Sequence, residues 1–549
     1  MATVRDATLG LLRELGMTTI FGNPGSTELP LLRDLPEDFR YVLALHESSA
    51  LGMAEGYARL GGNAALVNLH TAPGLGNAMG AMVTAFHNRT PLVVTAGQQH
   101  RGHISLEPML KGELVELAKP YVKRSHEPYS AEDVPRELLR AYHTAMTAPQ
   151  GPVFLSIPMD DLDADYGGSG EGSGNRTLPV TRVSYRTAPD PVALEEAAAV
   201  LMRAERPAIV AGPGVARSFA AARVAGERVE DGFEGVVALA ERLKAPVWQE
   251  GVVALAAFPQ RHPLFMGYLP LAQKLVAKTL APFDCVLVLG CRVFPYYPYL
   301  PGPVVREGTE VILFTDDPQE AAGIPVGRAV LGDVGLAVSS LSQMLPEAPR
   351  AMPEPAQKAE KPEASEPMSV AYVMDTLAGV LPQESVVADE STSSKATLRK
   401  YVLKESPESV ITSEAGGLGF CMPASVGAKL ARPEKTVVCV IGDGSSLYSV
   451  QSLWTAATYG VAVAFVVVNN RGYSILKSFR DLLGIESVPG LDLPGLDLVG
   501  IASGFGVPGE RVESPEGLVP ALERALSAEG PYLVDALVSR EVPPLVKDG

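Results

Sequence analysis

Short apolar runs alternate with longer segments of helical spacing along most of the chain. The runs are rich in Val, Ile and Leu and lack a regular polar alternation, which is typical of parallel strands that helices cover on both faces. This pattern predicts an α/β fold built on parallel sheets. The expected strands are residues 18–22, 41–45, 64–69, 91–97 and 151–157 in the first third, 206–212, 245–250, 283–290 and 309–315 in the second, and 385–390, 409–413, 436–442, 463–470 and 531–538 in the last.

Two segments interrupt this alternation and suggest where domains end. The stretch YGGSGEGSGN at 166–175 has the composition of a flexible connector, and residues 346–367 are rich in Pro, Ala and Glu. We therefore expect three doubly wound parallel-sheet domains: residues 1–180, residues 181–345 and, after a linker at 346–368, residues 369–549. The similar strings QGPVFLSIP and EGPYLVDAL suggest that the first and last domains are related, although any two parallel-sheet domains can share such features.

Composition narrows the class of protein. With 63 acidic against 46 basic residues the 549-residue chain carries a net charge of −17, which argues against a nucleic-acid-binding role. Its four cysteines lie mostly in apolar runs without metal-ligand spacing, so a disulfide framework or zinc site is not expected. No apolar run approaches the roughly 18 residues of a membrane span, and the charged N-terminal segment does not read as a secretory signal. These features predict a cytoplasmic protein without a membrane partner.

The most specific motif lies in the last third. Asp443 directly follows a buried strand within GDGSS at 442–446, and the next expected strand ends in Asn469 and Asn470. Carboxylate and amide oxygens at neighbouring strand ends are suitable ligands for Mg²⁺ that anchors a diphosphate. Small residues allow the backbone to approach phosphate groups. The alternative is an Asp that caps a helix and two Asn in a turn.

This motif resembles the magnesium and thiamine-diphosphate binding motif of thiamine-dependent enzymes. Within that superfamily the chain is most similar to the benzoylformate decarboxylases, on strings spread over nearly its whole length: FGNPGSTELP, NLHTAPGLGNAMGA, PLVVTAGQQ, APQGPVFLSIP, AERLKAPVW, GGLGF and LWTAATYG. The resemblance implies pyrimidine-binding, middle and diphosphate-binding domains in that order. It also implies thiamine diphosphate and Mg²⁺ as cofactors, and a homotetramer whose active sites lie between subunits.

The resemblance assigns roles to residues that match the family motifs. It implies that Glu47 hydrogen-bonds the aminopyrimidine, that Ser26 binds the substrate carboxylate, and that His70 relays protons. Taken alone, Glu47 is a helix N-terminal acid and His70 a packing residue. The implied magnesium ligands are Asp443, Asn470 and the Gly472 carbonyl. The other implied cofactor contacts are Gly416, the wedge Leu418, Thr392, Ser393, Gly444, Ser445 and Tyr473.

Three features depart from the family pattern. Tyr297 stands where the family carries a second active-site histidine, and a phenol is a poor proton shuttle near neutral pH. Ile475 replaces a small alanine, so we expect a narrower pocket for a phenyl ring. The middle third contains AGPGV at 211–215, which is either a tight turn without ligand or a dinucleotide turn, and an insertion around residues 218–235 without an assigned role.

The predicted activity is the non-oxidative decarboxylation of a 2-oxo acid, of the benzoylformate kind, to an aldehyde and CO2. The first alternative is a carboligase or lyase that forms or cleaves 2-hydroxy ketones, which slow protonation at Tyr297 favours. An alternative of another class is a non-catalytic, regulatory relative that binds thiamine diphosphate. The intact Glu47, Asp443, Asn470 and Leu418 argue against the last hypothesis.

Overall fold

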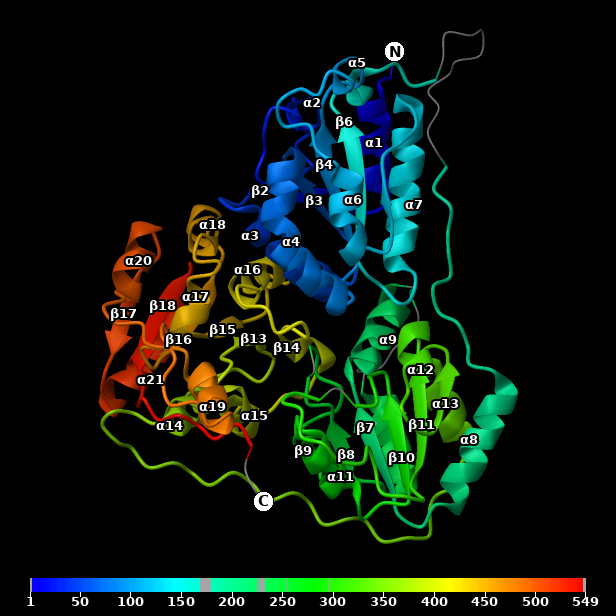
Figure 1. Cartoon of the computed structure of the whole chain (residues 1–549), viewed down its shortest axis with the longest axis vertical. Coiled ribbons are helices and arrows are strands. Elements are labelled where there is room, and N and C mark those ends of the chain that lie inside the picture. The colour runs from blue at the N-terminus through cyan, green and yellow to red at the C-terminus, as the bar shows by residue number, and fades with distance from the viewer. Residues whose placement is uncertain are drawn as a thin grey trace.

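Three α/β units make up the chain in the computed structural model, which describes residues 2–167, 179–224, 226, 233–252, 254–294 and 296–546. Figure 1 shows the first unit in blue and cyan at the top, the second in green at the lower right, and the third in yellow to red at the lower left. Residues 346–368 run between the second and third units, largely exposed and almost without regular structure. Within the described residues, no helix combines the length and the apolar character that crossing a membrane requires.

The first unit is a six-stranded sheet in which every neighbouring pair is parallel, in the order β2-β1-β3-β4-β6-β5. Its strands are β1 (Thr19–Gly22), β2 (Arg40–Leu43), β3 (Ala65–Leu69), β4 (Leu92–Gln98), β5 (Ser125–His126) and β6 (Val153–Pro158). Its helices are α1 (Val4–Glu14), α2 (Leu29–Leu32), α3 (Glu47–Gly61), α4 (Thr71–His87), α5 (Arg101–Ile104), α6 (Leu114–Ala118) and α7 (Val134–Met146).

The second unit is also a parallel six-stranded sheet, with the order β12-β11-β10-β7-β8-β9. This is the doubly wound order in which the first strand lies at the centre. The strands are β7 (Pro207–Ala211), β8 (Val247–Gln249), β9 (Phe265–Tyr268), β10 (Cys285–Leu289), β11 (Glu310–Thr315) and β12 (Arg328–Leu331). The helices are α8 (Pro191–Arg203), α9 (Pro213–Val224), α10 (Glu234–Leu243), α11 (Gln273–Leu280), α12 (Pro318–Ala322) and α13 (Val334–Met344).

The third unit repeats the strand order of the first when each is counted from its own first strand: β14-β13-β15-β16-β18-β17. Its strands are β13 (Val386–Glu390), β14 (Val410–Ile411), β15 (Val437–Gly442), β16 (Val463–Asn469), β17 (Gly509–Val512) and β18 (Tyr532–Leu537). Its helices are α14 (Val370–Val380), α15 (Lys395–Tyr401), α16 (Cys421–Ala431), α17 (Asp443–Ser446), α18 (Ser452–Thr458), α19 (Ser474–Leu482), α20 (Leu498–Gly504) and α21 (Pro515–Ser527).

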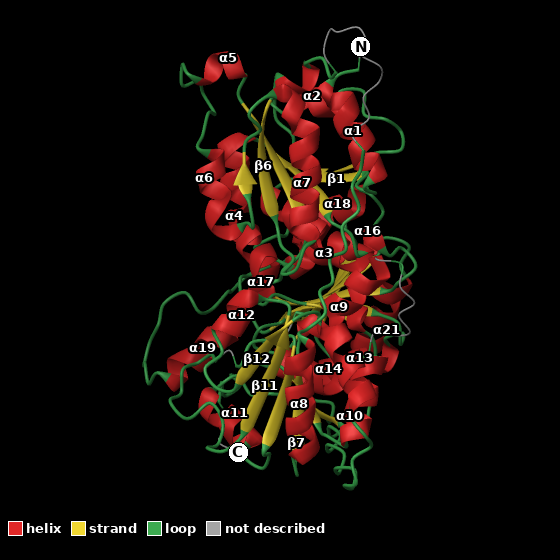
Figure 2. Ribbon diagram, turned by 90° about the vertical axis from the view of Figure 1, so that its right-hand side faces the viewer, coloured by secondary structure: helices red, strands yellow, loops and turns green. Residues whose placement is uncertain are grey.

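These observations confirm the predicted fold class of three doubly wound parallel sheets, and Figure 2 shows strands of the first and middle sheets between their helices. Every expected strand range contains an observed strand, and the structure adds β5, β9, β12 and β17 at sheet edges. The exact domain boundaries stay a prediction. Most of the proposed Gly/Ser connector lies outside the described residues, as do residues 225 and 227–232 of the proposed insertion at 218–235, which begins within α9.

The first and third domains each have a core of their own and also share a third buried cluster. A single buried apolar cluster contains side chains from both, including Phe21, Leu51, Phe420 and Phe465, whereas the middle domain has clusters of its own. Helices α3 and α16 form the centre of the shared core. Their backbones approach closely: a Cβ at Gly56 would overlap the Ala424 carbonyl, and one at Gly427 would overlap the Met53 carbonyl.

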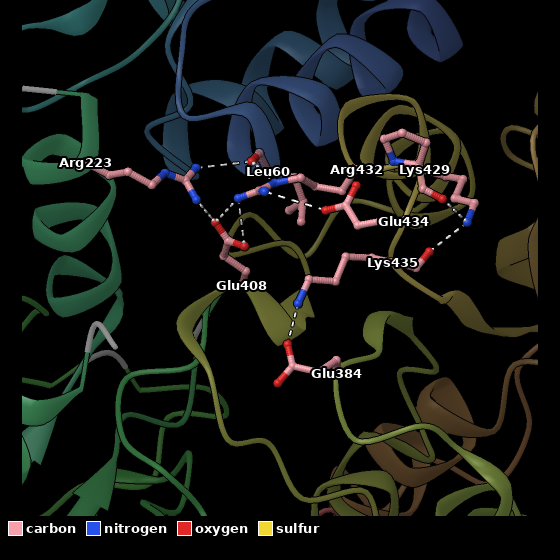
Figure 3. A network of polar contacts seen from close by, with 9 residues as sticks. Leu60, Arg223, Glu384, Glu408, Lys429, Arg432, Glu434 and Lys435 are labelled. Carbon is pink, nitrogen blue, oxygen red and sulfur yellow. Dashed lines mark hydrogen bonds and ion pairs between the residues drawn. The ribbon is translucent and has the colours of Figure 1, made fainter. Parts of the chain in front are cut away.

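A polar junction joins the middle domain to this pair (Figure 3). Glu408 of the third domain accepts hydrogen bonds from Arg223 on α9 and from Arg432, the latter at 2.9 Å. Both guanidinium groups also donate to the carbonyl of Leu60 at the end of α3, at 3.2 and 3.0 Å. All three domains therefore meet at Glu408, near the end of α3.

Replacing Gly56 with Ala should destabilise the protein by about 1–3 kcal/mol, because the added methyl group overlaps backbone of α16 that can move only if the domains separate. The matched control is Gly61→Ala at the end of the same helix, where no described residue outside the adjoining chain lies within 4 Å of the new methyl group. Urea unfolding followed by circular dichroism measures both variants. If the Gly56→Ala protein unfolds at the wild-type urea concentration, the helices do not pack this closely.

Candidate active site

The three predicted magnesium ligands lie together at the carboxyl ends of two central strands of the third sheet. Strands β15 and β16 are parallel neighbours, so Asp443 and Asn470 follow adjacent strand ends. Asp443 is buried, and its carboxylate accepts a hydrogen bond from the backbone N–H of Gly472 at 2.9 Å. The side-chain oxygen of Asn470 is buried without a hydrogen-bond partner among the described residues.

The electrostatics of these strand ends fit a divalent cation. Burial raises the pKa of Asp443 to about 6, the negative charge of Asp535 acts in the same direction, and hydrogen bonds from Gly444 and Gly472 oppose it. A cation would stabilise the negative charge of this carboxylate and would give the Asn470 side-chain oxygen the partner that it lacks among the described residues. The described residues contain no cluster of three or more His, Cys, Asp and Glu side chains arranged to hold a metal. This set instead combines one carboxylate with amide and backbone oxygens.

The residues predicted to contact the diphosphate surround the same strand ends. Strand β13 pairs with β15, so Thr392 and Ser393 follow a strand end next to Asp443, where Thr392 is exposed and Ser393 half-buried. Gly444 lies against Tyr473, and a Cβ there would overlap the tyrosine ring. Ser445, its neighbour in α17, is buried. Any larger residue at position 444 would displace the Tyr473 ring or the turn after β15.

The GGLGF turn lies between β14 and α16. Gly416 has a φ of +71° and is exposed, and Leu418 is half-buried. The turn is anchored by Glu390, whose carboxylate accepts hydrogen bonds from the backbone N–H groups of Gly419, Phe420 and Cys421. Sequence reasoning missed Glu390, although it ends an expected strand in the string SVVADE.

In the first domain the structure brings Glu47 and His70 together. Glu47 is the first residue of α3, is buried, and accepts a hydrogen bond from the Asn77 amide at 3.1 Å. Gly74 lies between the two side chains, because a Cβ there would be 3.2 Å from Glu47 Oε1 and 3.6 Å from His70 Cβ. Sequence reasoning also missed Asn77, which lies in the matched string from Asn68.

His70 is held by a second carboxyl that sequence reasoning missed. Its Nδ1 lies 2.8 Å from Glu28 Oε2, and buried Glu28 also accepts hydrogen bonds from the backbone N–H groups of Gly25 and Gly97 at 2.9 Å each. The imidazole packs directly against Gly25, next to the exposed Ser26. Ser26 and His70 therefore lie at adjacent strand ends, since β1 pairs with β3. Glu28 could have been identified from the sequence, because it lies in the matched string FGNPGSTELP.

Of the two predicted pocket residues, Ile475 lies on α19 and Tyr297 packs against that helix. Tyr297, which comes from the middle domain, is 64% exposed, and its ring centroid lies 5.1 Å from that of Phe479. Phe479 stands four residues after the half-buried Ile475 on the same helix. Two groups result, one around Glu47 in the first domain and one around Asp443 in the third. No hydrogen bond or ion pair joins Glu47 to Asp443 in the described part of the chain.

The glycines of the AGPGV turn have a structural explanation. A Cβ at Gly212 would overlap Cys291, and one at Gly214 would lie 2.5 Å from the Cα of Gly290. Close packing of two strand-end turns therefore accounts for both glycines, without a nucleotide.

Comparison with known proteins identifies the family. The chain matches three family models: the thiamine pyrophosphate enzyme N-terminal TPP binding domain over residues 2–118, the central domain over 194–341 and the C-terminal TPP binding domain over 390–536. It is 42% identical to benzoylformate decarboxylase of Pseudomonas aeruginosa over 540 residues, which cover 97% of this chain and 98% of the relative.

Two solved structures resemble the whole chain. The crystal structure of benzoylformate decarboxylase from Polynucleobacter necessarius superposes with a TM-score of 0.94 at 36% identity, over 99% of this chain and 100% of that one. The thiamine diphosphate-dependent 4-hydroxybenzoylformate decarboxylase of Rhodococcus jostii gives a TM-score of 0.92 at 38% identity, with the same coverage. The chain therefore belongs to the thiamine pyrophosphate enzyme family, in which it is similar along its whole length to benzoylformate decarboxylases.

Proposed function

We propose that the chain is a thiamine-diphosphate-dependent decarboxylase that converts a 2-oxo acid of the benzoylformate class into an aldehyde and CO2. One observation carries the proposal: a buried carboxylate and an unpartnered amide oxygen, Asp443 and Asn470, stand at the strand ends where the residues that match the family's cofactor motif gather. The full-length similarity to benzoylformate decarboxylases supports the substrate class.

The third domain holds the cofactor in this proposal. Asp443, the Asn470 side chain and the Gly472 carbonyl would hold Mg²⁺, which would neutralise the charge of the diphosphate. The Gly416 carbonyl would accept a hydrogen bond from the aminopyrimidine amine, and the Leu418 side chain would support the cofactor. The other diphosphate contacts are Thr392, Ser393, Gly444, Ser445 and Tyr473. When bound, thiamine diphosphate supplies a nucleophilic carbon and accepts the electron pair that departing CO2 leaves behind.

The first domain acts on protons and on the substrate. Glu47 holds a proton at the aminopyrimidine ring nitrogen, and Asn77 orients its carboxyl. Ser26 binds the substrate carboxylate through its exposed hydroxyl. His70 delivers the proton that releases the aldehyde, and Glu28 fixes the orientation of its ring.

A carboligase or lyase remains the alternative, and Tyr297 is the residue that favours it. A tyrosine in place of a histidine protonates poorly near neutral pH, which leaves time for a second carbonyl compound to react. The main product decides between the two: an aldehyde supports decarboxylation, and a 2-hydroxy ketone supports ligation.

The proposal extends to assembly and location. The active enzyme is a homotetramer in which Glu47 of one subunit faces Asp443 of another, so that the two groups of residues complete each other. Large apolar side chains are exposed on both domains, such as Met109 (85%) after α5 and Leu483 (66%) after α19, and a second subunit would cover such side chains. The four cysteines are buried and unpaired, in keeping with the predicted reducing, cytoplasmic location.

The direct test adds thiamine diphosphate and Mg²⁺ to the purified protein and follows CO2 and organic products from benzoylformate, phenylpyruvate and pyruvate. We expect cofactor-dependent CO2 together with an aldehyde, and faster turnover of aromatic substrates. Cofactor binding without turnover of any 2-oxo acid would instead support the non-catalytic relative.

Replacing Glu47 with Gln should leave thiamine diphosphate binding largely unchanged and slow exchange of the thiazolium C2 proton by about 100-fold or more, because the amide cannot hold the proton on the pyrimidine. Proton NMR in D2O measures the exchange without any substrate. Glu37→Gln at an exposed position is the control and should exchange like the wild type. Wild-type exchange in the Glu47→Gln protein would exclude the proposed acid role.

Replacing Ile475 with Ala should raise the preference for aryl over small aliphatic 2-oxo acids by about tenfold, because the side chain beside Phe479 narrows the pocket. The ratio of kcat/KM for benzoylformate to that for pyruvate reports the change. Leu482→Ala, at the end of the same helix, is the control and should leave the ratio unchanged. An unaltered or reversed ratio in the Ile475→Ala protein would place the pocket elsewhere.

A further inference from the structure

Glu390 connects two parts of the candidate cofactor site that are far apart in the sequence. It is the last residue of β13 and is only 3% exposed, and Thr392 and Ser393 follow two and three residues later. Its carboxylate crosses to the GGLGF turn, where Oε1 accepts from Gly419 N at 2.6 Å and Oε2 accepts from Phe420 N and Cys421 N at 2.8 Å each. Both carboxylate oxygens are thus committed to backbone groups of one turn.

Two of these N–H groups, those of Phe420 and Cys421, belong to a helix start, where the first backbone N–H groups have no partner within the helix, and Gly419 directly precedes them. Helix α16 begins at Cys421, and its N-cap residue Phe420 provides no side-chain hydrogen bond. Glu390 therefore caps α16 from another strand, and the positive end of the helix favours its negative charge. Burial raises the pKa of Glu390 to about 7, while the three backbone donors and the nearby Lys395 act in the opposite direction. A buried carboxylate that loses its hydrogen-bond donors destabilises the folded protein, so the charge of Glu390 favours keeping these three donors in place.

The turn depends on this anchor because little else holds it. In the described part of the chain, residues 416–418 make no hydrogen bond of their own, and the nearest backbone anchor on the other side is Ala415 N to Ser413 Oγ at 3.2 Å. Gly419 has a φ of +92°, and a Cβ there would lie 2.8 Å from Tyr448 Cβ, so the chain is also confined beside the anchor. Leu418 directly precedes the first anchored residue.

We infer that Glu390 is a positioning residue that sets where Leu418 and the Gly416 carbonyl stand relative to the diphosphate contacts, and thereby how closely the pyrimidine amine approaches the thiazolium carbon. The inference rests on the proposed function. The rate of proton transfer from the thiazolium carbon to the pyrimidine amine falls steeply when the two groups are misplaced. A shift of about 1 Å in Leu418 therefore lowers this rate by on the order of 100-fold. Glu390 itself touches neither substrate nor reacting atoms.

The test compares Glu390→Gln with the wild type in two measurements that need no turnover: the dissociation constant for thiamine diphosphate with Mg²⁺, and the rate of C2 proton exchange. An amide offers one acceptor oxygen and turns an N–H₂ donor toward backbone donors, so the turn must move. We expect affinity within about threefold of the wild type and exchange slower by on the order of 100-fold. Near-ultraviolet circular dichroism of the bound cofactor should change with it, because this signal reports the arrangement of its rings.

The matched control is Glu250→Gln. Glu250 is also a buried carboxyl, its pKa is raised to about 8 by burial, and it accepts one backbone hydrogen bond, from Val252 N at 2.9 Å, which an amide oxygen can keep. It lies at the end of β8 in the middle domain, and its variant should show wild-type exchange. Where Glu390→Gln does not fold, Glu390→Asp keeps the charge but draws it back by one methylene, and slower exchange is again expected.

The outcomes separate this inference from the function on which it rests. If the wild-type protein shows no cofactor-dependent C2 exchange, the proposed function fails. If the wild type exchanges and the variant that folds exchanges equally fast, only the role of Glu390 fails. If affinity falls as much as exchange and the cofactor-free variant unfolds at lower temperature than the Glu250→Gln protein, Glu390 serves stability alone and the inference is overturned.

Discussion

The close contact between α3 and α16 is the constraint on which the arrangement of both cofactor-related groups depends. Backbone meets backbone where Gly56 faces Ala424 and Gly427 faces Met53, so these helices cannot slide without a clash. Helix α3 begins with Glu47, and α16 begins just after Leu418. The proposed proton-holding residue therefore starts one helix of a rigid pair, the proposed wedge lies three residues before the other, and the shared apolar cluster fixes the domains around them.

A second principle recurs at the ends of the parallel strands: buried carboxylates hold loops through backbone N–H groups. Glu28 accepts from Gly25 and Gly97, and Glu390 accepts from three successive residues of the turn before α16. Asp443 likewise accepts from the backbone N–H of Gly472, whereas the side-chain oxygen of nearby Asn470 has no hydrogen-bond partner among the described residues. Satisfied carboxylates at these strand ends build the scaffold, and the incompletely satisfied group is the one that suits a ligand.

The interior strands could be predicted because burial on both faces leaves a continuous apolar run, as in β15 and β16. The strands that sequence reasoning missed all lie at sheet edges, where one side of the strand faces solvent. Strand β17 reads GERV, and β12 begins with a half-buried Arg328, so neither carries the apolar signal. Edge strands pair because a neighbouring strand presents its backbone groups, and that information lies elsewhere in the chain.

The same distinction applies to the site. Asp443, Asn470, Glu47 and His70 could be selected because each lies directly at a strand end within a short, specific string. Sequence reasoning did not identify Glu28 and Glu390, because their hydrogen-bond partners are distant in sequence, such as Gly97 and Cys421. Tyr297 illustrates the limit most clearly: its position opposite Phe479 arises where the middle domain meets α19, a contact that no local pattern encodes. Local motifs therefore point to the groups that are proposed to bind ligands, whereas the structure is needed to show which buried carboxyls hold the loops around them.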